Sequence, residues 1–246
     1  MIPVAEFWNS TVGKKAVVAV TGTILVGYLI LHMVGNLNSL FGPGGAEPRV
    51  DWYAGWLREI AEPLFPYAGV LWLVRAILLG SIVIHITGVL QLNSRNRAAR
   101  PSRYPARRIG RSWESGAMLV SGILVLAFII FHILQFTTLS ITVTPLEHGA
   151  VYFNLYNAFQ EWYFVVIYLA ALVLVGIHLR HGIWSLVQTL GLDSPARNRG
   201  IRYGATALTM VIVIGFALVP VLFWTGALGA PETEAAIASL AGGIAS

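Results

Sequence analysis

The sequence predicts an all-α integral membrane protein with a single membrane domain, residues 1–246. Only 11% of its residues are charged and its mean hydropathy is +0.72, whereas soluble domains are usually about 25% charged. Five apolar stretches are each long enough to cross a bilayer, which takes about 20 residues. They do not alternate in polarity as the strands of a membrane β-barrel would. The chain contains no cysteine, which excludes disulfides, Fe–S ligation and c-type haem attachment within it.

The five predicted membrane helices cover residues 16–40, 67–92, 115–140, 160–187 and 203–228. The first is far longer than the core of a signal peptide, so we expect it to be retained. Residues 41–66 form a predicted interfacial loop, in which a short helix near 49–61 would hold aromatic side chains at the headgroup level. We expect the tail after Trp224 to be frayed. No internal repeat is evident along the chain.

Basic residues predict the orientation of these helices, because cytoplasmic loops carry an excess of Lys and Arg. One side carries twelve of them: Lys14, Lys15, Arg95, Arg97, Arg100, Arg103, Arg107, Arg108, Arg111, Arg197, Arg199 and Arg202. The other side carries only Arg49 and Arg58. The N-terminus is therefore predicted to be cytoplasmic and the C-terminus outside. A basic cytoplasmic face also suits docking of a soluble partner.

Four histidines lie inside the first four predicted helices, one in each: His32, His85, His132 and His178. A histidine within a membrane helix is costly and marks a functional site. At about 1.5 Å per residue, His32 and His132 lie at nearly the same depth toward the outer face. His85 and His178 share a second depth toward the cytoplasmic face, roughly 15 Å away. The sequence thus predicts two histidine pairs, His32 with His132 and His85 with His178.

Two facing neutral imidazoles are suitable axial ligands of a six-coordinate haem iron, so each pair is predicted to bind one haem b. With both axial positions filled, such a haem transfers electrons and binds no substrate. Small residues beside the histidines would let a flat macrocycle pack closely: Gly35, Ser81, Gly88 and Gly182. Zinc or di-iron sites would need acidic ligands, and the middle of the first four helices has none. A lone membrane histidine could instead bond a neighbouring helix, but four in two depth-matched pairs favour haem.

Two further polar residues are predicted to contact haem propionates. Arg75 lies level with the outer pair, where a buried guanidinium needs an anionic partner. The alternative for Arg75 is that its side chain reaches the outer headgroups. His181 lies one helical turn after His178 and is either a propionate contact or an alternative ligand. His148, in an outer loop, is interpreted as a solvated residue.

The segments around these residues resemble one known family, the cytochrome b membrane anchor of succinate dehydrogenases and fumarate reductases. The form resembled is the single-chain, five-helix, two-haem anchor found in many bacteria. The resemblance is carried by LHMVGNLNSLFG in the first helix, LWLVR and SIVIHITG in the second, FIIFHILQFT in the third and HLRHGIWSLVQTLG in the fourth. It extends over essentially the whole chain in length, helix count and histidine placement.

The resemblance implies that His32 and His132 hold a haem distal to the soluble subunits, and that His85 and His178 hold the proximal haem. It implies two partners on the cytoplasmic face of a bacterial inner membrane, a flavoprotein with covalent FAD and an iron–sulfur subunit. FAD and Fe–S clusters would lie only in those partners, and no nucleic acid is expected to bind. The complex would be a succinate dehydrogenase (quinone) of the tricarboxylic acid cycle, or would run in reverse, while this chain supplies no catalytic residue.

A quinone of the mena- or ubiquinone type would be the membrane substrate, in an apolar slot with hydrogen-bond donors and a proton route. The outer end offers Tyr53, Trp56, Arg58 and Trp72, with Glu59 and Glu62 as proton donors. The cytoplasmic end offers a rival set, Ser112, Trp113, Glu114 and Ser115. The outer aromatic residues would otherwise form an interfacial belt.

Two other functions stay open on the sequence alone. One is a di-haem cytochrome b that anchors a different redox enzyme, of the nitrate reductase, formate dehydrogenase or hydrogenase type. The other is a haem-free transporter or structural anchor. That last alternative lacks the inverted repeat and broken helices expected of many transporters.

Overall fold

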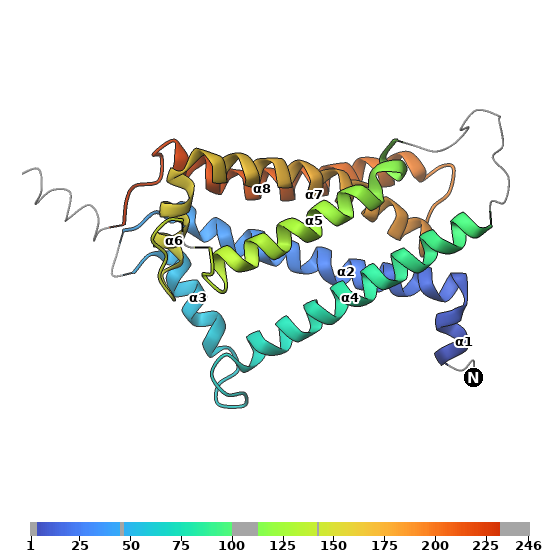
Figure 1. Ribbon diagram of the computed structural model, residues 1–246, viewed down its shortest axis with the longest axis horizontal. Coiled ribbons are helices and arrows are strands. Elements are labelled where there is room, and N and C mark those ends of the chain that lie inside the picture. The colour runs from blue at the N-terminus through green and yellow to red at the C-terminus, as the bar shows by residue number, and fades with distance from the viewer. Residues whose placement is uncertain (1–3, 45–46, 100–112, 142, 232–246) are drawn as a thin grey trace, which may run out of the picture.

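The computed structural model describes residues 4–44, 47–99, 113–141 and 143–231. Within these ranges the regular structure is entirely helical (Figure 1). The elements are α1 Val4–Asn9, α2 Thr11–Leu37, the 3₁₀ turn η1 Asn38–Phe41, α3 Arg49–Glu59, α4 Gly69–Ala98, α5 Trp113–Phe136, α6 Val151–Gln160, α7 Trp162–Thr189 and α8 Asn198–Trp224.

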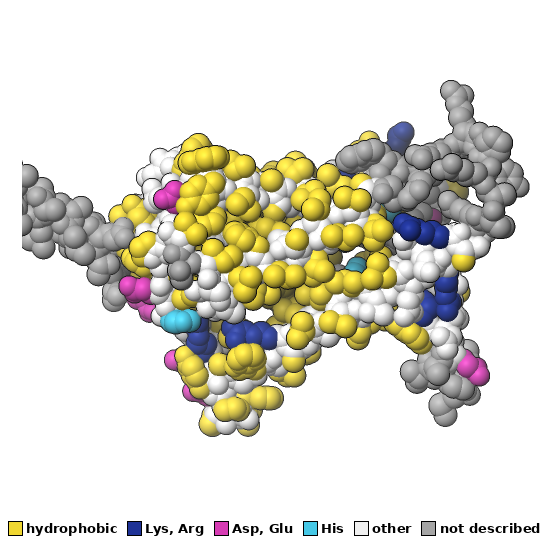
Figure 2. All heavy atoms as spheres, in the orientation of Figure 1, with side chains coloured by type: hydrophobic (Ala, Val, Ile, Leu, Met, Phe, Trp, Pro, Cys, Tyr) yellow, Lys and Arg dark blue, Asp and Glu magenta, His cyan; other side chains and the backbone are white. Residues whose placement is uncertain are grey.

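Five of these helices are long and apolar enough to cross a membrane: α2 with η1, α4, α5, α7 and α8. The all-helical prediction and the five predicted spans are therefore confirmed, and they indicate a multi-pass membrane protein. Helices α2, α5 and α8 run in one direction, and α4 and α7 run in the other (Figure 1). Figure 2 shows apolar side chains over the middle of one face and charged side chains toward its two ends.

The helix boundaries differ from the predicted ones where polar turns adjoin an apolar stretch. Helix α2 begins at Thr11 rather than at residue 16, because Ser10 caps it by accepting a 2.8 Å hydrogen bond from the backbone N–H of Gly13. Helix α8 likewise begins at Asn198 rather than at 203. Hydropathy locates the apolar part of a helix, whereas capping determines where the backbone becomes helical.

Polar contacts join the first turns of α2 to the last turns of α4. Lys14 lies inside α2 and is only 1% exposed. Its Nζ donates to Oε1 of Gln91 on α4 and lies 4.2 Å from the ring centroid of Trp8 on α1. Arg95 adds a 2.7 Å hydrogen bond from Nη1 to the backbone carbonyl of Asn9. This end of the molecule, marked by α1, is called the inner end below.

Two short helices cover the opposite end, called the outer end below (Figure 1). Helix α3 matches the interfacial helix predicted near 49–61, whereas α6 lies in a connection for which no helix was predicted. Asp51 of α3 caps α6, since its Oδ1 accepts a 3.0 Å hydrogen bond from the backbone N–H of Tyr152. Burial raises the pKa of Tyr152 to about 12, so its hydroxyl stays protonated and donates to the carbonyl of Gly229 at 2.9 Å. A cap supplied from another helix leaves no local sequence signal.

The four histidine-bearing helices pack in an open row, in the order α4, α2, α7, α5. Helix α8 packs on α7 and α2. Among the described residues, α4 at one end of the row makes no comparable packing contact with α5 at the other end. Figure 1 shows α4 diverging from the remaining helices toward its first turn. The four helices therefore form an open row, in which α4 and α5 lie at opposite ends.

Candidate metal centres

The outer pair consists of His32 on α2 and His132 on α5. Their ring centroids are 5.7 Å apart and their planes meet at 75°. The ring of Tyr28 stacks on His32, with 5.4 Å between centroids and 11° between planes. Phe216 of α8 approaches His32 from another side, at 5.7 Å. The two imidazoles thus meet across the row, from helices that are not packed neighbours.

His132 lies among aromatic rings and has one hydrogen-bond partner within the described part of the chain. The rings of Phe128 and Phe136 lie 6.0 and 5.6 Å from its own. Its Nδ1 lies 3.0 Å from Oη of Tyr168 on α7. Tyr168 in turn donates to Oε1 of Gln135 at 2.9 Å, and Gln135 is fully buried. The Nε2 of Gln135 has no hydrogen-bond partner among the described residues.

The inner pair consists of His85 on α4 and His178 on α7, which lie close enough to interact electrostatically. The Nδ1 of His85 lies 3.2 Å from Oγ1 of Thr21 on α2. Correspondingly, the Nδ1 of His178 lies 3.3 Å from Oγ of Ser121 on α5. Each ring is thus held by a hydroxyl on the preceding long helix of the chain, since α2 precedes α4 and α5 precedes α7.

Backbone and glycine complete the surroundings of both inner rings. The backbone of Val18 lies close to His85, and that of Met118 lies close to His178. A Cβ built on Gly22 would lie 3.4 Å from Cε1 of His85, and one on Gly122 would lie 3.2 Å from Cε1 of His178. Both imidazoles therefore pack edge-on against a glycine.

These surroundings reveal an internal repeat that was not evident in the sequence. The residues Val18, Thr21, Gly22 and His32 recur, each 100 positions later, as Met118, Ser121, Gly122 and His132. In both copies the hydroxyl and glycine contact the inner histidine of the next long helix, and the histidine ten residues after the glycine belongs to the outer pair. Helices α2 and α5 run in the same direction (Figure 1), so the repeat is parallel rather than inverted.

The hydrogen bonds have a common chemical consequence. A neutral imidazole carries one N–H, and a ligating histidine usually donates it to a second partner while the other nitrogen binds the metal. In His85, His132 and His178 the partnered atom is Nδ1. Each of these rings therefore has Nε2 available as a ligand. Within the described residues, no three His, Cys, Asp or Glu side chains converge on one point.

The other residues predicted to contact a haem lie beside the pairs. The guanidinium of Arg75 lies 4.7 Å from the ring centroid of Trp72, and it interacts electrostatically with Tyr28, which stacks on His32. His181 interacts electrostatically with His178. His148 is exposed, as expected for a loop residue.

Two of the four small residues named from the sequence contact protein instead of leaving open space. A Cβ on Gly88 would lie 2.6 Å from Cγ2 of Val18, so Gly88 lets α4 approach α2. A Cβ on Gly35 would lie 2.9 Å from Cε1 of Tyr53. Gly182 has open space around it, and Ser81 is buried. The glycines that touch histidine rings, Gly22 and Gly122, were not singled out from the sequence.

The structure brings together part of the residue set predicted for quinone. Tyr53 packs on Gly35, one turn beyond His32, and its ring centroid is 5.8 Å from that of Trp56. Arg58 instead donates from Nη1 to the carbonyl of Ala54 in its own helix. Trp72 is exposed on α4 beneath Arg75. Of the rival set, Ser112 and the side chains of Trp113, Glu114 and Ser115 lie outside the described part of the chain.

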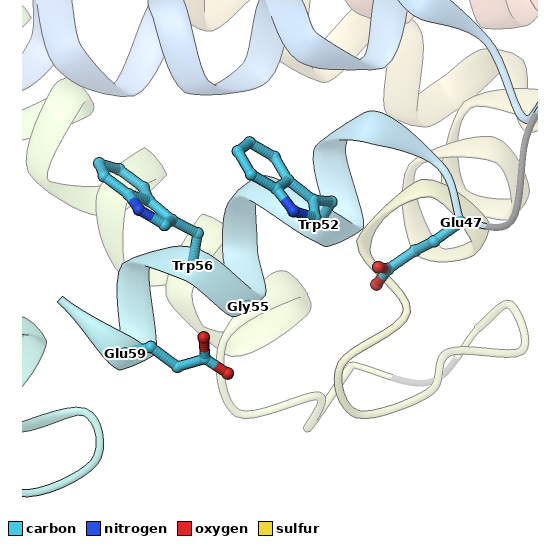
Figure 3. Close-up of a pocket in the computed structure, with 5 residues that line it drawn as sticks. All are labelled: Glu47, Trp52, Gly55, Trp56 and Glu59. Atoms are coloured by element: carbon cyan, nitrogen blue, oxygen red, sulfur yellow. The ribbon is translucent and has the colours of Figure 1, made fainter. Parts of the chain in front are cut away.

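A cavity of about 260 Å³ opens beside α3, lined by Glu47, Trp52, Gly55, Trp56 and Glu59. Figure 3 shows the two indole rings side by side along the helix and the two carboxylates pointing toward each other. Of the predicted quinone contacts, only Trp56 lines this cavity, together with Glu59, one of the two predicted proton donors.

The supporting residues Thr21, Ser121, Tyr168 and Gln135 were missed in the sequence. Hydroxyl residues are common in membrane helices, so nothing distinguished Thr21 or Ser121 before the 100-residue repeat was recognised. Gln135 did carry a signal, as a polar side chain one turn after His132 in an apolar helix.

In comparisons with known proteins, no family model, curated protein or solved structure matches this chain.

Proposed function

We propose that this chain is the di-haem cytochrome b membrane anchor of a succinate:quinone oxidoreductase. One observation carries the proposal: each histidine pair joins two helices that are not packed neighbours, α2 with α5 and α4 with α7. A flat group held between two imidazoles needs ligands from helices that do not pack directly on each other. The family resemblance of the sequence narrows the redox partner to a succinate dehydrogenase.

The residues present fit haem b. Each site supplies two imidazoles, which are the residues that would hold the iron of a b-type haem used for electron transfer. His32 and His132 would hold one haem, and His85 and His178 the other. The buried Nε2 of Gln135 has no partner among the described residues, as expected of a donor whose acceptor belongs to a bound group. Gln135, Arg75 and His181 are the side chains that would donate to carboxylates of the haems.

When bound, such haems supply reversible one-electron exchange at six-coordinate iron. The protein's own contribution is to hold the haems, to orient the histidine rings and to exclude water. The aromatic rings around His32 and His132 exclude water from the outer pair, and the hydroxyls of Thr21 and Ser121 orient the inner rings. Because the pairs lie at successive depths along the helices, the four histidines define a path from the inner end to the outer end.

Charge and aromatic residues support a direction for this path. Basic residues of the described helices gather at the inner end, namely Lys15, Arg95, Arg97, Arg199 and Arg202. This end would face the cytoplasm and dock the iron–sulfur and flavoprotein subunits. Quinone would bind at the outer end near Tyr53 and Trp56, with Glu59 as a proton donor beside the cavity on α3.

Two measurements on the purified complex test the proposal. A reduced-minus-oxidised spectrum should show b-type bands corresponding to two haems per chain, and a chain without b-type absorbance would contradict the cytochrome assignment. Co-purified soluble subunits should oxidise succinate in a quinone-dependent reaction. Two haems with soluble subunits inactive on succinate would instead identify a cytochrome b that anchors a different redox enzyme.

A further inference from the structure

We propose that Tyr168 and Gln135 form a directional hydrogen-bond relay that fixes His132 in the tautomer presenting Nε2 to iron. The inference rests on the proposed haem function. Tyr168 and Gln135 act through His132 and are therefore positioning residues.

Two hydrogen bonds define the relay, 3.0 Å between Nδ1 of His132 and Oη of Tyr168, and 2.9 Å from that hydroxyl to Oε1 of Gln135. Its members come from α5 and α7, and Gln135 follows His132 by one helical turn. Phe159 of α6 and the rings of Phe128 and Phe136 surround Tyr168 at 5.1 to 6.0 Å. In apolar surroundings each polar atom depends on the partner that the fold provides.

The direction of the relay follows from proton counting. A tyrosine hydroxyl has one proton to donate, and a neutral imidazole has one N–H. If Tyr168 donated to Nδ1 of His132, the imidazole proton would sit on Nε2 and block that atom as a ligand. Because Tyr168 donates to Gln135 instead, its oxygen is free to accept from Nδ1–H. The amide oxygen of Gln135 therefore determines which nitrogen of His132 is available to iron.

At the inner pair, the hydroxyls that contact the histidines donate their protons to carbonyls of their own helices. The hydroxyl of Thr21 donates to the carbonyls of Val17 and Val18 in its own helix, at 2.9 and 3.1 Å. Ser121 donates to the carbonyl of Met118 at 3.2 Å. Serine and threonine can bond the preceding helical turn in this way, whereas a tyrosine hydroxyl lies too far from its own backbone. Tyr168 therefore requires a separate acceptor, and Gln135 supplies it.

The test compares four variants in the assembled complex: Tyr168→Phe, Gln135→Leu, Gln135→Glu and, as a control on α7, Tyr163→Phe. Wild type is measured first, and absence of haem there refutes the proposed function itself. Haem content, the electron paramagnetic resonance signals of the two ferric haems and their midpoint potentials are then recorded. The inner haem reports in every variant whether the fold is intact.

We expect Tyr168→Phe and Gln135→Leu to alter the outer haem alone. Loss of such a supporting partner typically weakens metal binding about 10- to 100-fold. Where the outer haem is retained, its midpoint potential should rise because an undonated Nδ1–H makes the imidazole a poorer electron donor. Gln135→Glu and Gln135→Leu both lose the Nε2 donor, but Gln135→Glu keeps an acceptor oxygen for Tyr168 and should alter the outer haem less than Gln135→Leu does. Tyr163→Phe should resemble wild type.

The decisive variant is Gln135→Leu, because Gln135 lies one hydrogen bond away from the ligand. An outer haem unchanged by Gln135→Leu would overturn the relay, even if Tyr168→Phe altered it. Equal damage by Gln135→Glu and Gln135→Leu would also overturn it, since a packing role would explain both. If Tyr168→Phe prevents assembly, the two Gln135 variants decide between these outcomes.

Discussion

The two members of each histidine pair occupy corresponding positions in a repeated helical frame, yet the surroundings of the two pairs differ in kind. The inner rings lie against glycine and are held by short hydroxyls that are themselves bonded to the helix backbone. The outer rings lie among aromatic side chains, and His132 has a longer tether through Tyr168 to Gln135. The repeat therefore duplicates the ligand positions and the supports of the inner rings. The tether through Gln135 is not duplicated, since the residue 100 positions before Gln135 is Gly35.

The surroundings of the two pairs differ because different parts of the fold pack against them. The outer rings adjoin the core formed where α6, α7 and α8 meet, which includes Phe159, Tyr168 and Phe223. The inner rings contact the backbone and small residues of α2 and α5 directly. We therefore expect the inner pair to be sensitive to added volume and the outer pair to lost hydrogen bonds.

Removing a ligand should produce the largest effect and separate the two centres. His85→Ala is expected to abolish the inner haem and spare most of the outer one, and His132→Ala should do the reverse, because the pairs share no ligand. Haem content and low-temperature absorption spectra measure both. Loss of both haems from either variant, with the protein still folded, would show that the pairs are not independent.

Adding one methyl group should distinguish the two copies of the glycine contact. In Gly122→Ala the new Cβ would lie 3.2 Å from Cε1 of His178, so the ring must move by a few tenths of an ångström. In Gly22→Ala the corresponding distance to His85 is 3.4 Å, an ordinary contact. We expect Gly122→Ala to shift the resonance signal and lower the occupancy of the inner haem, and Gly22→Ala to resemble wild type.

The control for these variants is Gly27→Ala on α2, where a Cβ would meet nothing within 4 Å. A larger effect from Gly22→Ala than from Gly122→Ala would contradict the distances on which the prediction rests. An outer haem altered by Gly122→Ala would contradict the separation of the two pairs.

Removing the hydroxyl tethers should have a smaller effect than removing the relay. Thr21→Val and Ser121→Ala each take the hydroxyl partner from an inner histidine, but the iron ligand itself and the glycine contact of the ring remain. We expect a small rise in the midpoint potential of the inner haem and nearly complete haem content. Redox titration of the two haems checks this, and an inner-haem loss as large as the outer-haem loss in Tyr168→Phe would show that the inner rings depend on their hydroxyl partners as strongly as His132 depends on Tyr168.

The smallest effect is expected at the cover over the outer end. Asp51→Ala removes the cap of α6 and should lower the free energy of unfolding by about 1 kcal/mol. Asp51→Asn keeps the acceptor oxygen for the N–H of Tyr152 without a buried charge and should be at least as stable as wild type at neutral pH. Thermal unfolding in detergent measures both, and the inner haem should be unaffected in either variant.

Asp51 also predicts a dependence of stability on pH. Burial raises the pKa of this carboxyl above its ordinary value of 3.8, although backbone N–H groups of Tyr152 and Val151 act in the opposite direction. The folded state then binds the proton more tightly than the unfolded state, so the free energy of unfolding falls as pH rises from 3.8 through the raised pKa. Asp51→Asn should remove this slope, and an unchanged slope in that variant would assign it to another group.

Much of the fold could be predicted because hydropathy is a property of consecutive residues. The number of long helices and the short helix α3 follow from composition along the chain. Helix α6 could not be predicted in this way, since the residue that caps it, Asp51, is 101 positions from Tyr152 in the sequence. The start of α2 was misplaced because a polar first turn, including the buried Lys14, is invisible to hydropathy.

The sequence by itself determined which histidines share a depth, because depth depends only on helix direction and a constant rise per residue. Only the tertiary structure decided which side chains support them. Tyr168 is 36 positions from His132 and Ser121 is 57 from His178, and these contacts depend on how each helix is rotated about its axis and which neighbours it packs against. Those variables are set by packing between helices, which no single segment of the chain encodes.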